Sequence, residues 1–431
     1  MEKHFALRER GTTVAREIMA GLTTFLTMAY IIFVNAQVLS NIPALKGSVP
    51  ALAAATCLAA AIPTLLMGLW TNMPLALAPG MGLNGALAFG LCLGRGVSWQ
   101  TAMGVIVVEG ILITLLVLVG LRESILRAIP LALRHAIAAG IGLFLALLGM
   151  VNAGLVRMNL PSAPLTFGNV HDRGVQVAII GAVITFALFA LRWRAALLAG
   201  ILIATVLALL TGVAKPPEVW LQVPDFATFG QADVVGALQP ALWASVLAFL
   251  MSDFFDSMGT VLGVGREAGL TGPEGEVPRL REVLLVDSCA AWWGGLCGAS
   301  SATAYIESAS GVAEGGRTGL TAVTVGVLFL ASLFFAPLAG VVPPQATAAA
   351  LIVVGFLMLK SVRDIAFDRV EEALPAFVTL ITIPFTYSIA RGIGYGFISY
   401  VVILCALRRW RDLHPLMVGV TLLFALAFAL E

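Results

Sequence analysis

The sequence predicts an all-α protein that crosses a membrane many times. Of its 431 residues, 60% are hydrophobic and 11% are charged, whereas a soluble chain carries about 25% charged residues. Apolar runs of about 20 residues, the length of one helical crossing of a bilayer, recur along the chain. So few charges cannot coat several water-facing domains, and we therefore expect about fourteen transmembrane segments.

The candidate spans fall into two sets, which a polar interval at 215–233 separates. The first set lies at 14–39, 51–70, 74–94, 99–119, 135–151, 175–191 and 195–212. The second set lies at 240–263, 283–299, 300–312, 318–339, 343–360, 372–388, 392–407 and 415–430. Pro384, Arg391 and Gly392 interrupt the short segments near the C-terminus, so we expect some of these segments to cross only in part.

Lys and Arg residues concentrate in alternate loops, which predicts the orientation of the chain. Cytoplasmic loops of membrane proteins carry an excess of basic residues. With the N-terminus in the cytoplasm, most of the 25 Lys and Arg residues lie on the cytoplasmic side, among them Arg408, Arg409 and Arg411. Placing these three there requires the segment 372–407 to form a hairpin. The sequence therefore predicts a multi-pass protein of the cell membrane with a cytoplasmic N-terminus.

The composition and motifs also exclude several functions. The net charge is +1 and no long basic tract occurs, so no nucleic-acid partner is expected. The five cysteines lie in apolar stretches without paired spacing, and the four histidines lie near loop ends, so neither a metal site nor a disulfide framework is predicted. The phosphate-binding loop of ATP-driven pumps and the H-E-x-x-H and G-x-S-x-G motifs are absent from the sequence. We expect no cofactor, no catalytic residue and no enzymatic activity.

Two apolar segments are interrupted by glycine, proline and other small residues. PLALAPGMGLNGALAFG covers 74–90, and GGLCGASSATAYIESASGVAEGG covers 294–316. Each contains the third candidate span of its set. Irregular backbone at membrane depth has to line a cavity or be buried in protein, and broken segments at matching positions of two halves indicate the substrate site of a transporter. The pair therefore predicts a binding site at these segments.

Several carboxylates lie inside the predicted spans, where an ionisable group costs about 2.5 to 3.5 kcal/mol at a helix centre. Asp253 and Asp256 stand three residues apart in the span 240–263, so both are expected on one helix face, towards one cavity. Glu307 lies in the second broken segment. Because such carboxylates usually mark a substrate or proton path, we expect Asp256 and Glu307 to be functional. For Asp253, a functional role and a hydrogen-bond anchor remain equally compatible with the sequence.

The other polar residues of the membrane segments allow more modest expectations. Glu109 in the middle of one span and Asp287 at the start of another favour structural roles. Glu314 is expected to form a salt bridge or to take a capping role with Arg317 near the membrane interface. Asn84 follows the first glycine-rich break, where its amide can bond either substrate or freed backbone, and we favour the substrate.

Five stretches of the sequence resemble the AzgA-like branch of the nucleobase permeases. They are TTFLTMAYIIFVNAQVLS at 23–40, ALAPGMGLN at 76–84, DFFDSMGTVLGVGREAGL at 253–270, YIESASGVAEGGRTGLTAV at 305–323 and PFTYSIARGIGYGFISY at 384–400. The resemblance extends in order along nearly the whole chain, and the YIES and GGRTGLTA motifs are its most specific part. Members of this family transport adenine, guanine and hypoxanthine, and they are related to the uracil and xanthine permeases.

The resemblance implies a fold of fourteen spans in two inverted repeats of seven. The segments 14–119 and 240–339, which hold spans one to four and eight to eleven, would form a core domain. The segments 122–212 and 343–430, which hold spans five to seven and twelve to fourteen, would form a gate domain. In the third and tenth spans a short strand leads into a half-helix, and the purine lies between them. A homodimer through the gate domain is also implied.

The same resemblance assigns substrate-binding residues. The carboxylate of the eighth span corresponds to Asp256, with Asp253 nearby, and the glutamate of the tenth span corresponds to Glu307. The other assigned residues lie in the two broken segments and are Gly82, Asn84, Thr303 and Ala304.

These carboxylates suit a purine and a proton. A purine edge carries N–H and NH2 donors, which a carboxylate accepts in charge-assisted hydrogen bonds about twice as strong as neutral ones. Burial favours the neutral form of a carboxylate, so Glu307, Asp256 and Asp253 are candidates for carrying a proton inward. The sequence thus predicts a proton-coupled purine importer in which the core domain slides against the gate domain in an elevator-type motion.

Two alternative functions stay open. An anion or carboxylate exchanger on the same architecture predicts a cationic site, whereas neither broken segment holds a basic residue in its apolar part. An intramembrane aspartyl enzyme requires two facing carboxylates from separate helices, whereas Asp253 and Asp256 lie on one predicted helix.

Overall fold

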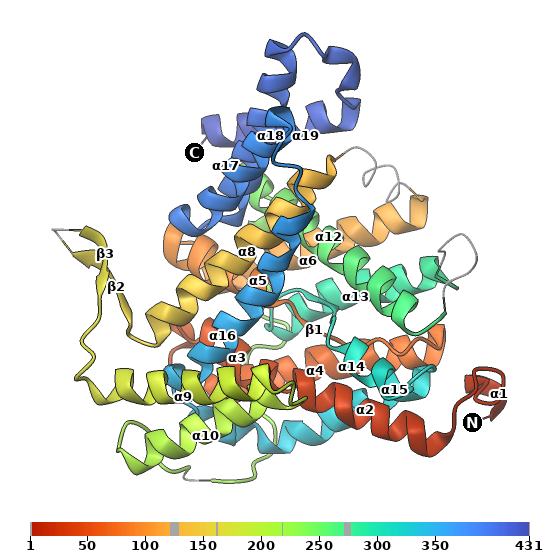
Figure 1. The fold of residues 1–431 in the computed structure, drawn as a ribbon, viewed down its shortest axis with the longest axis vertical. Helices are drawn as coiled ribbons and strands as arrows, with labels where there is room; N and C mark the ends of the chain where they lie inside the picture. The colour runs from red at the N-terminus through yellow and green to blue at the C-terminus, as the bar shows by residue number, and fades with distance from the viewer. Residues whose placement is uncertain (1, 121–128, 161–162, 218, 271–276, 431) are drawn as a thin grey trace.

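The computed structural model describes residues 2–120, 129–160, 163–217, 219–270 and 277–430. Within these residues, nine helices are long and apolar enough to span a membrane, and shorter apolar helices accompany them. The protein is therefore a multi-pass membrane protein that consists mostly of helices (Figure 1). The predicted all-α fold class is confirmed.

The first half of the chain contains the spans predicted up to residue 212. Its elements are α1 (Glu2–Phe5), α2 (Val14–Met28), α3 (Tyr30–Leu39), η1 (Pro43–Leu45), α4 (Val49–Leu66), η2 (Met67–Thr71), β1 (Leu77–Pro79), α5 (Met81–Gly85), η3 (Ala86–Leu93), α6 (Trp99–Val119), α8 (Leu131–Asn152), β2 (Val156–Leu160), β3 (Ala163–Phe167), α9 (Arg173–Ala190) and α10 (Ala196–Leu210). Thr13 and Ser98 start α2 and α6, because each hydroxyl accepts a hydrogen bond from the backbone N–H three residues further on.

The second half contains the remaining predicted spans. Its elements are α11 (Val234–Ala237), η4 (Pro240–Leu242), α12 (Trp243–Glu267), α13 (Leu280–Cys297), β4 (Ala302–Ala304), α14 (Ser308–Ala313), α15 (Gly319–Ser332), η5 (Leu333–Val341), α16 (Pro344–Leu359), η6 (Lys360–Asp364), α17 (Val370–Thr386), α18 (Ile389–Ala406), η7 (Trp410–Asp412) and α19 (Pro415–Leu430). α17 and α18 form the hairpin that the basic residues require. Gly392 of α18 packs against Ile383 of α17. Gly396, one turn further on, packs against Thr379, one turn earlier.

The sequence prediction differs from the structure in small features. Each predicted apolar segment coincides with a helix or with a strand that leads into a short helix. The antiparallel β2–β3 hairpin between α8 and α9 was not predicted. The first residues of the predicted gate segment, 122–128, lie outside the described residues, and with them Arg122 and Arg127.

The two broken segments meet in the interior of the molecule. β1 pairs antiparallel with β4, with Leu77 opposite Ala304 and Pro79 opposite Ala302. Figure 1 shows β1 surrounded by helices from both halves of the chain. Each strand leads into a short helix, β1 into α5 and β4 into α14. The predicted strand and half-helix breaks in the third and tenth spans are therefore confirmed.

The helices pack in two groups around these strands. In one group, α2 and α4 contact α15, and α6 and α4 contact α13. In the other group, α8 contacts α16 and α17, and α16 also contacts α9 and α10. The elements that carry the broken segments belong to the first group, because β1 packs on α4 and β4 packs on α13.

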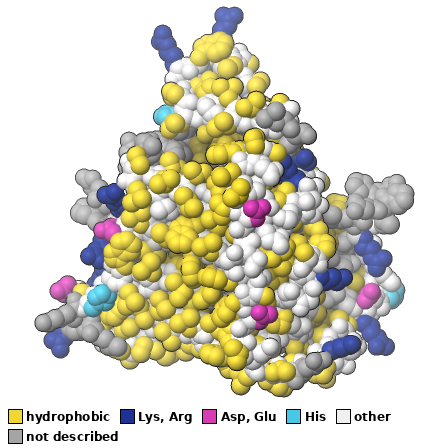
Figure 2. Space-filling model, turned by 180° about the vertical axis from the view of Figure 1, so that it is seen from behind, with side chains coloured by type: hydrophobic (Ala, Val, Ile, Leu, Met, Phe, Trp, Pro, Cys, Tyr) yellow, Lys and Arg dark blue, Asp and Glu magenta, His cyan; other side chains and the backbone are white. Residues whose placement is uncertain are grey.

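The outer surface is apolar, as a lipid-facing surface has to be. Figure 2 shows a broad face of hydrophobic side chains with Lys and Arg mainly at its margins. Val206, Phe334 and Leu422 are each more than half exposed. Apolar areas of this extent mark contact with another phase or partner. Because nine helices of the described residues are long and apolar enough to span a membrane, that phase is the bilayer.

A close glycine contact joins η2 of the first half to α15 of the second. A Cβ atom added at Gly319 would overlap the backbone oxygen of Gly68 and lie 2.9 Å from Cα of Asn72. Because backbone atoms cannot rotate aside, we expect Gly319→Ala to lower the free energy of unfolding by about 1–3 kcal/mol, the usual cost of overpacking. Denaturant unfolding of the purified protein in detergent measures this change. Gly419→Ala, whose added methyl group meets nothing within 4 Å, is the control, and equal stability of the two variants would contradict the prediction.

Candidate functional site

Hydrogen bonds from neighbouring segments hold the paired strands in place. The N–H of Tyr305, directly after β4, donates to the carbonyl oxygen of Ala76, directly before β1 (2.9 Å). The Asp287 carboxylate on α13 accepts a hydrogen bond from the N–H of Ala304 in β4 (3.0 Å). Because each strand is only three residues long, such bonds satisfy buried backbone groups that a longer strand pair would satisfy by itself.

Asp256 and Glu307 flank these strands. Asp256 lies in the middle of α12 and is exposed, whereas Glu307 lies at the start of α14 and is partly buried. The phenol of Tyr30, at the start of α3, donates a hydrogen bond to Glu307 Oε1 (2.7 Å). Asp256 and Glu307 are close enough to interact electrostatically. Two neighbouring carboxylates repel each other unless a proton or a hydrogen-bond donor lies between them, so the pair suits a ligand that brings donors.

The face of α12 that carries Asp256 is open towards the C-terminal end of the helix. Gly259 and Gly263 follow Asp256 on this face and are also exposed. A Cβ atom at Gly259 would meet nothing within 4 Å, and one at Gly263 would meet only Ile306 Cδ1 at 3.7 Å. Ile306 itself is 52% exposed. Small residues therefore leave space along α12 that leads to Asp256.

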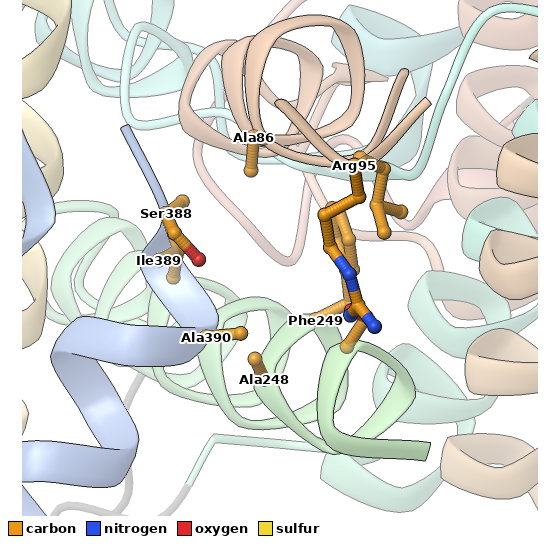
Figure 3. A pocket seen from close by; sticks show the side chains of 10 residues that line it. Ala86, Arg95, Ala248, Phe249, Ser388, Ile389 and Ala390 are labelled. Atoms are coloured by element: carbon orange, nitrogen blue, oxygen red, sulfur yellow. The ribbon is translucent and has the colours of Figure 1, made fainter. Parts of the chain in front are cut away.

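The N-terminal end of α12 is more tightly closed. A narrow cavity there is lined by Ala86, Gly90, Leu91, Arg95, Ser245, Ala248, Phe249, Ser388, Ile389 and Ala390, and it contains neither Asp256 nor Glu307. Figure 3 shows Arg95 on one side of it and Ser388 and Ile389 on the other. The Arg95 guanidinium donates to Ser245 Oγ (3.1 Å) and to the carbonyl oxygen of Ala241 (2.8 Å). Arg95 thereby ties the end of the third span to the start of α12.

Asn84 is held on α5 with its amide group unused. The residue is fully buried, and neither Nδ2 nor Oδ1 has a hydrogen-bond partner among the described residues. A buried polar group without a partner costs about 1–3 kcal/mol. The amide therefore offers a donor and an acceptor to a group that the described chain does not supply.

The other residues assigned from the resemblance lie at packing contacts of the broken segments. Gly82 of α5 lies directly against Ile141 of α8, where a Cβ atom would clash with the isoleucine side chain. The hydroxyl of Thr303 is hydrogen-bonded to Ser257 Oγ on α12 (2.7 Å). Ala304 is buried, and its N–H is the donor to Asp287 described above.

The structure separates the two aspartates of α12. Asp253 is 1% exposed, whereas Asp256 is exposed. The Asp253 carboxyl group lies within hydrogen-bonding reach of the Glu109 carboxyl group on α6. The expectation that both aspartates face one cavity is therefore wrong, because Asp253 is directed into the contact between α12 and α6.

The predicted pairing of Glu314 with Arg317 is also wrong. Glu314 forms an ion pair with Arg194, between α9 and α10. The Arg317 guanidinium instead donates to the carbonyl oxygens of Val312 (2.7 Å) and Gly316 (2.8 Å), because its side chain folds back over the end of α14. In the described part of the chain, no group of three or more His, Cys, Asp or Glu residues could hold a metal ion.

Two tyrosines at the site were missing from the sequence prediction. Tyr30 contacts Glu307 directly, and the Tyr305 hydroxyl donates to the carbonyl oxygen of Pro79 in β1 (2.5 Å). Both tyrosines are almost fully buried. A signal was available, because a tyrosine hydroxyl in an apolar span needs a hydrogen-bond partner, and Tyr305 stands two residues before Glu307.

The chain is similar to permeases along its whole length. The profile described as the permease family matches residues 15–395. The adenine permease AdeQ of Escherichia coli (strain K12) is 43% identical over 431 residues, 100% of this chain and 96% of the relative. The guanine/hypoxanthine permease PbuG of Bacillus subtilis (strain 168) is 42% identical over 438 residues, 99% of each chain. A putative permease of Methanocaldococcus jannaschii is 43% identical over 99% of this chain and 98% of its own.

Two solved transporters share the fold. The transmembrane domain of the cyanobacterial bicarbonate transporter BicA has a TM-score of 0.66 at 14% identity, covering 87% of this chain and 96% of that one. SLC26A9 has a TM-score of 0.64 at 14% identity, covering 92% of this chain and 66% of that one. At these identities the likeness concerns the fold alone. With a profile match over most of its length and full-length relatives at 42–43% identity, the chain belongs to the permease family, in the branch of the adenine and guanine/hypoxanthine permeases.

Proposed function

We propose that the protein imports purine nucleobases across the cell membrane. The observation that carries this proposal is the pair of carboxylates, Asp256 and Glu307, beside the β1–β4 strands at an open face of α12. The relatives named for adenine, guanine and hypoxanthine transport support the substrate class.

The side chains at the site complement a purine. Asp256 accepts hydrogen bonds from the ring N–H and from an exocyclic amine, and Glu307, held by Tyr30, accepts from a second edge. The amide of Asn84 supplies both a donor and an acceptor. Gly82, Thr303 and Ala304 shape the broken segments that hold these groups.

We also propose that import is coupled to protons. A proton bound by a buried carboxyl group near the site lowers the negative charge around the purine, so the substrate and the proton bind together more readily than either does alone. We propose a cytoplasmic N-terminus, which the distribution of basic residues supports. A homodimer through the gate domain remains an expectation from the resemblance.

The motion we propose is an elevator-type displacement of a core domain, 14–119 and 240–339, against a gate domain, 122–212 and 343–430. The two groups of packed helices support this division, because the paired strands belong to one group and α8 to the other. The glycine face of α5 supports it further. Gly82 and Gly85 place α5 directly against Ile141 and Phe144 of α8, so α5 offers α8 a surface without side chains that obstruct sliding.

Gly82→Val tests the proposed sliding contact. The added side chain would collide with Ile141 of α8, and we expect the uptake rate to fall at least tenfold. Gly419→Val, in open surroundings on α19, should transport like the wild type. Normal uptake by Gly82→Val would argue against sliding at this contact.

Counterflow in proteoliposomes tests the proposed function itself. Radiolabelled adenine, guanine, hypoxanthine, uracil and sulfate are offered with and without a pH gradient. We expect exchange of at least one purine and its accumulation when the outside is more acidic. Absence of purine exchange would refute the substrate class, and exchange without any effect of the gradient would refute the proton coupling.

The likeness to a bicarbonate transporter keeps an anion exchanger as the alternative to test. The carboxylates of Asp256 and Glu307 would repel an anion, which is the reason we favour a neutral substrate with hydrogen-bond donors. Sulfate and bicarbonate counterflow in the same vesicles separates the two functions.

A further inference from the structure

A second group of carboxyl groups lies buried behind the substrate site. It consists of Glu109 on α6, Asp253 on α12 and Asp287 on α13, which are 0%, 1% and 1% exposed. The nearby Asp256, by contrast, is exposed. The helices α6, α12 and α13 thus each direct one acid into the same interior contact. None of these three acids binds the ligand in the function proposed above.

Glu109 is the member of this group whose carboxyl oxygens accept no hydrogen bond from an N–H or O–H group of the described residues. Its carboxyl group nevertheless lies within hydrogen-bonding reach of Asp253. Two ionised carboxylates offer acceptors only, so a hydrogen bond between them forms only when one of them carries a proton.

Among the described residues, the surroundings of Glu109 provide no positive charge to replace that proton. α6 packs against η3, α11, α12 and α13. The ionisable residues on these elements are Cys92, Asp253, Asp256, Arg266, Glu267, Arg281, Glu282, Asp287, Cys289 and Cys297. Of the two arginines, Arg281 bonds the carbonyl oxygen of Leu118 at the far end of α6, and Arg266 lies in the last turn of α12. The described charges that act on Glu109 are both acids, Asp253 and Asp287.

We propose that Glu109 and Asp253 form a shared-proton site, separate from the purine-binding carboxylates, and that this pair carries the proton that is transported with the purine. The inference deepens the proposed proton-coupled import and rests on it. A carboxyl–carboxylate pair holds one proton between two oxygens and charges to −2 when the proton leaves. In an interior of low dielectric this charge is costly, so the pair releases its proton only when the surroundings open to water.

Asp287 connects this pair to the substrate site. One of its oxygens accepts the N–H of Ala304 in β4, and β4 pairs with β1 and leads to Glu307. A second negative charge on the Glu109–Asp253 pair would repel Asp287. This repulsion would disturb the hydrogen bond between the Asp287 carboxylate and the N–H of Ala304 in β4. Asp256 lies one turn along α12 from Asp253 and also interacts with Asp287. Loss of the proton therefore weakens the hydrogen bond to β4 and so alters the strand pair that positions the purine.

Glu109→Gln tests this assignment in proteoliposomes that hold the full chain. Purine counterflow at equal pH is expected to stay within about threefold of the wild type, because the substrate-facing carboxylates are unchanged. Accumulation driven by a pH gradient is expected to fall from about tenfold per pH unit, the limit for one proton per purine, to no accumulation. Thr114→Val, on the same helix and in contact with Gly110, controls for altered packing of α6 and should leave the coupling intact.

The experiment distinguishes a failure of the shared-proton site from a failure of the proposed proton-coupled import. A Glu109→Gln protein that accumulates purine as the wild type does overturns the shared-proton site while leaving the proton-coupled import in place. If the wild type exchanges purine but shows no response to the pH gradient, the proposed coupling fails and the inference fails with it. Accumulation by the wild type in a sodium gradient, lost in Glu109→Gln, also overturns the assignment, because the acid group then holds a metal cation.

A second variant keeps the test decisive if Glu109→Gln does not fold. Asp253→Asn removes the other member of the pair and is expected to lose the same coupling with exchange retained. Purine-induced proton uptake provides a readout that a structural role would not change. It is followed with a pH dye in weakly buffered detergent solution, at a pH high enough for the purine-free pair to have released its proton. Wild type is expected to take up protons on binding purine, and a folded Glu109→Gln or Asp253→Asn protein that does so equally would contradict the inference.

Discussion

Asp256→Asn is expected to weaken purine binding by roughly 10- to 150-fold. A hydrogen bond to a charged group contributes about 1.5–3 kcal/mol, and asparagine presents an N–H2 group where the carboxylate accepted the donors of the purine. Asp256 is an exposed carboxylate in the middle of α12, so the substitution leaves few protein contacts to disturb. Equilibrium binding of radiolabelled adenine, guanine and hypoxanthine to the purified protein measures the change.

A matched control for this variant is Asp172→Asn. Asp172 starts α9 by accepting the N–H of Gly174 (2.8 Å), and asparagine serves equally well at the start of a helix. Its purine affinity should equal that of the wild type. If Asp256→Asn changes only the pH dependence of uptake while the affinity stays within twofold, Asp256 carries a proton and does not bind the purine.

Glu307→Gln is expected to lower purine uptake by roughly 30-fold or more. Removing one partner of a partly buried, hydrogen-bonded charge costs about 2–5 kcal/mol, and Glu307 both faces Asp256 and accepts the hydroxyl of Tyr30. Tyr30→Phe is expected to reduce uptake about tenfold, because Glu307 then loses the donor that orients it. Initial uptake rates in proteoliposomes measure both variants.

The double variant separates a direct role from a structural one. If Tyr30 acts only by holding Glu307, the Tyr30→Phe and Glu307→Gln double variant transports no more slowly than Glu307→Gln alone, because the coupled pair has already been broken. Additive losses would instead show that Tyr30 contacts the purine itself. Uptake by Glu307→Gln at the wild-type rate would refute the proposed site.

Local sequence patterns predicted the backbone of this protein well. The broken segments were predicted from their glycine and proline content, since helix interruption inside an apolar run leaves few arrangements that satisfy the backbone. The strand and short helix in each broken segment agree with the fold that the resemblance implies, whereas the pairing of β1 with β4 was not predicted. The hairpin of α17 and α18 was predicted from the distribution of basic residues among the loops. That distribution can be read from the sequence without knowing how the helices pack.

Contacts between distant segments were not predictable in the same way. Asp253 and Asp256 share a helix turn, yet the neighbouring α6 buries one and leaves the other exposed. Arg194, more than a hundred residues away, pairs with Glu314 in place of the nearby Arg317. Tyr30 reaches Glu307 across a separation of 277 residues. Such pairs depend on how the helices are placed in space, and a single sequence does not record that placement.

The pairing of the two strands has a consequence for how the protein is made. The N–H of Ala76 donates to Ser308 Oγ (3.0 Å), a residue that is translated 232 positions later. At about 5–20 residues per second, a ribosome needs roughly 10 to 50 seconds to supply it. During that interval the extended backbone of 77–79 has no strand partner, and hydrocarbon does not tolerate exposed peptide groups. The segment around 77–79 must therefore stay in the insertion machinery or at the bilayer surface until the second half has been translated. The rate of translation thus limits how soon the membrane-embedded site can assemble.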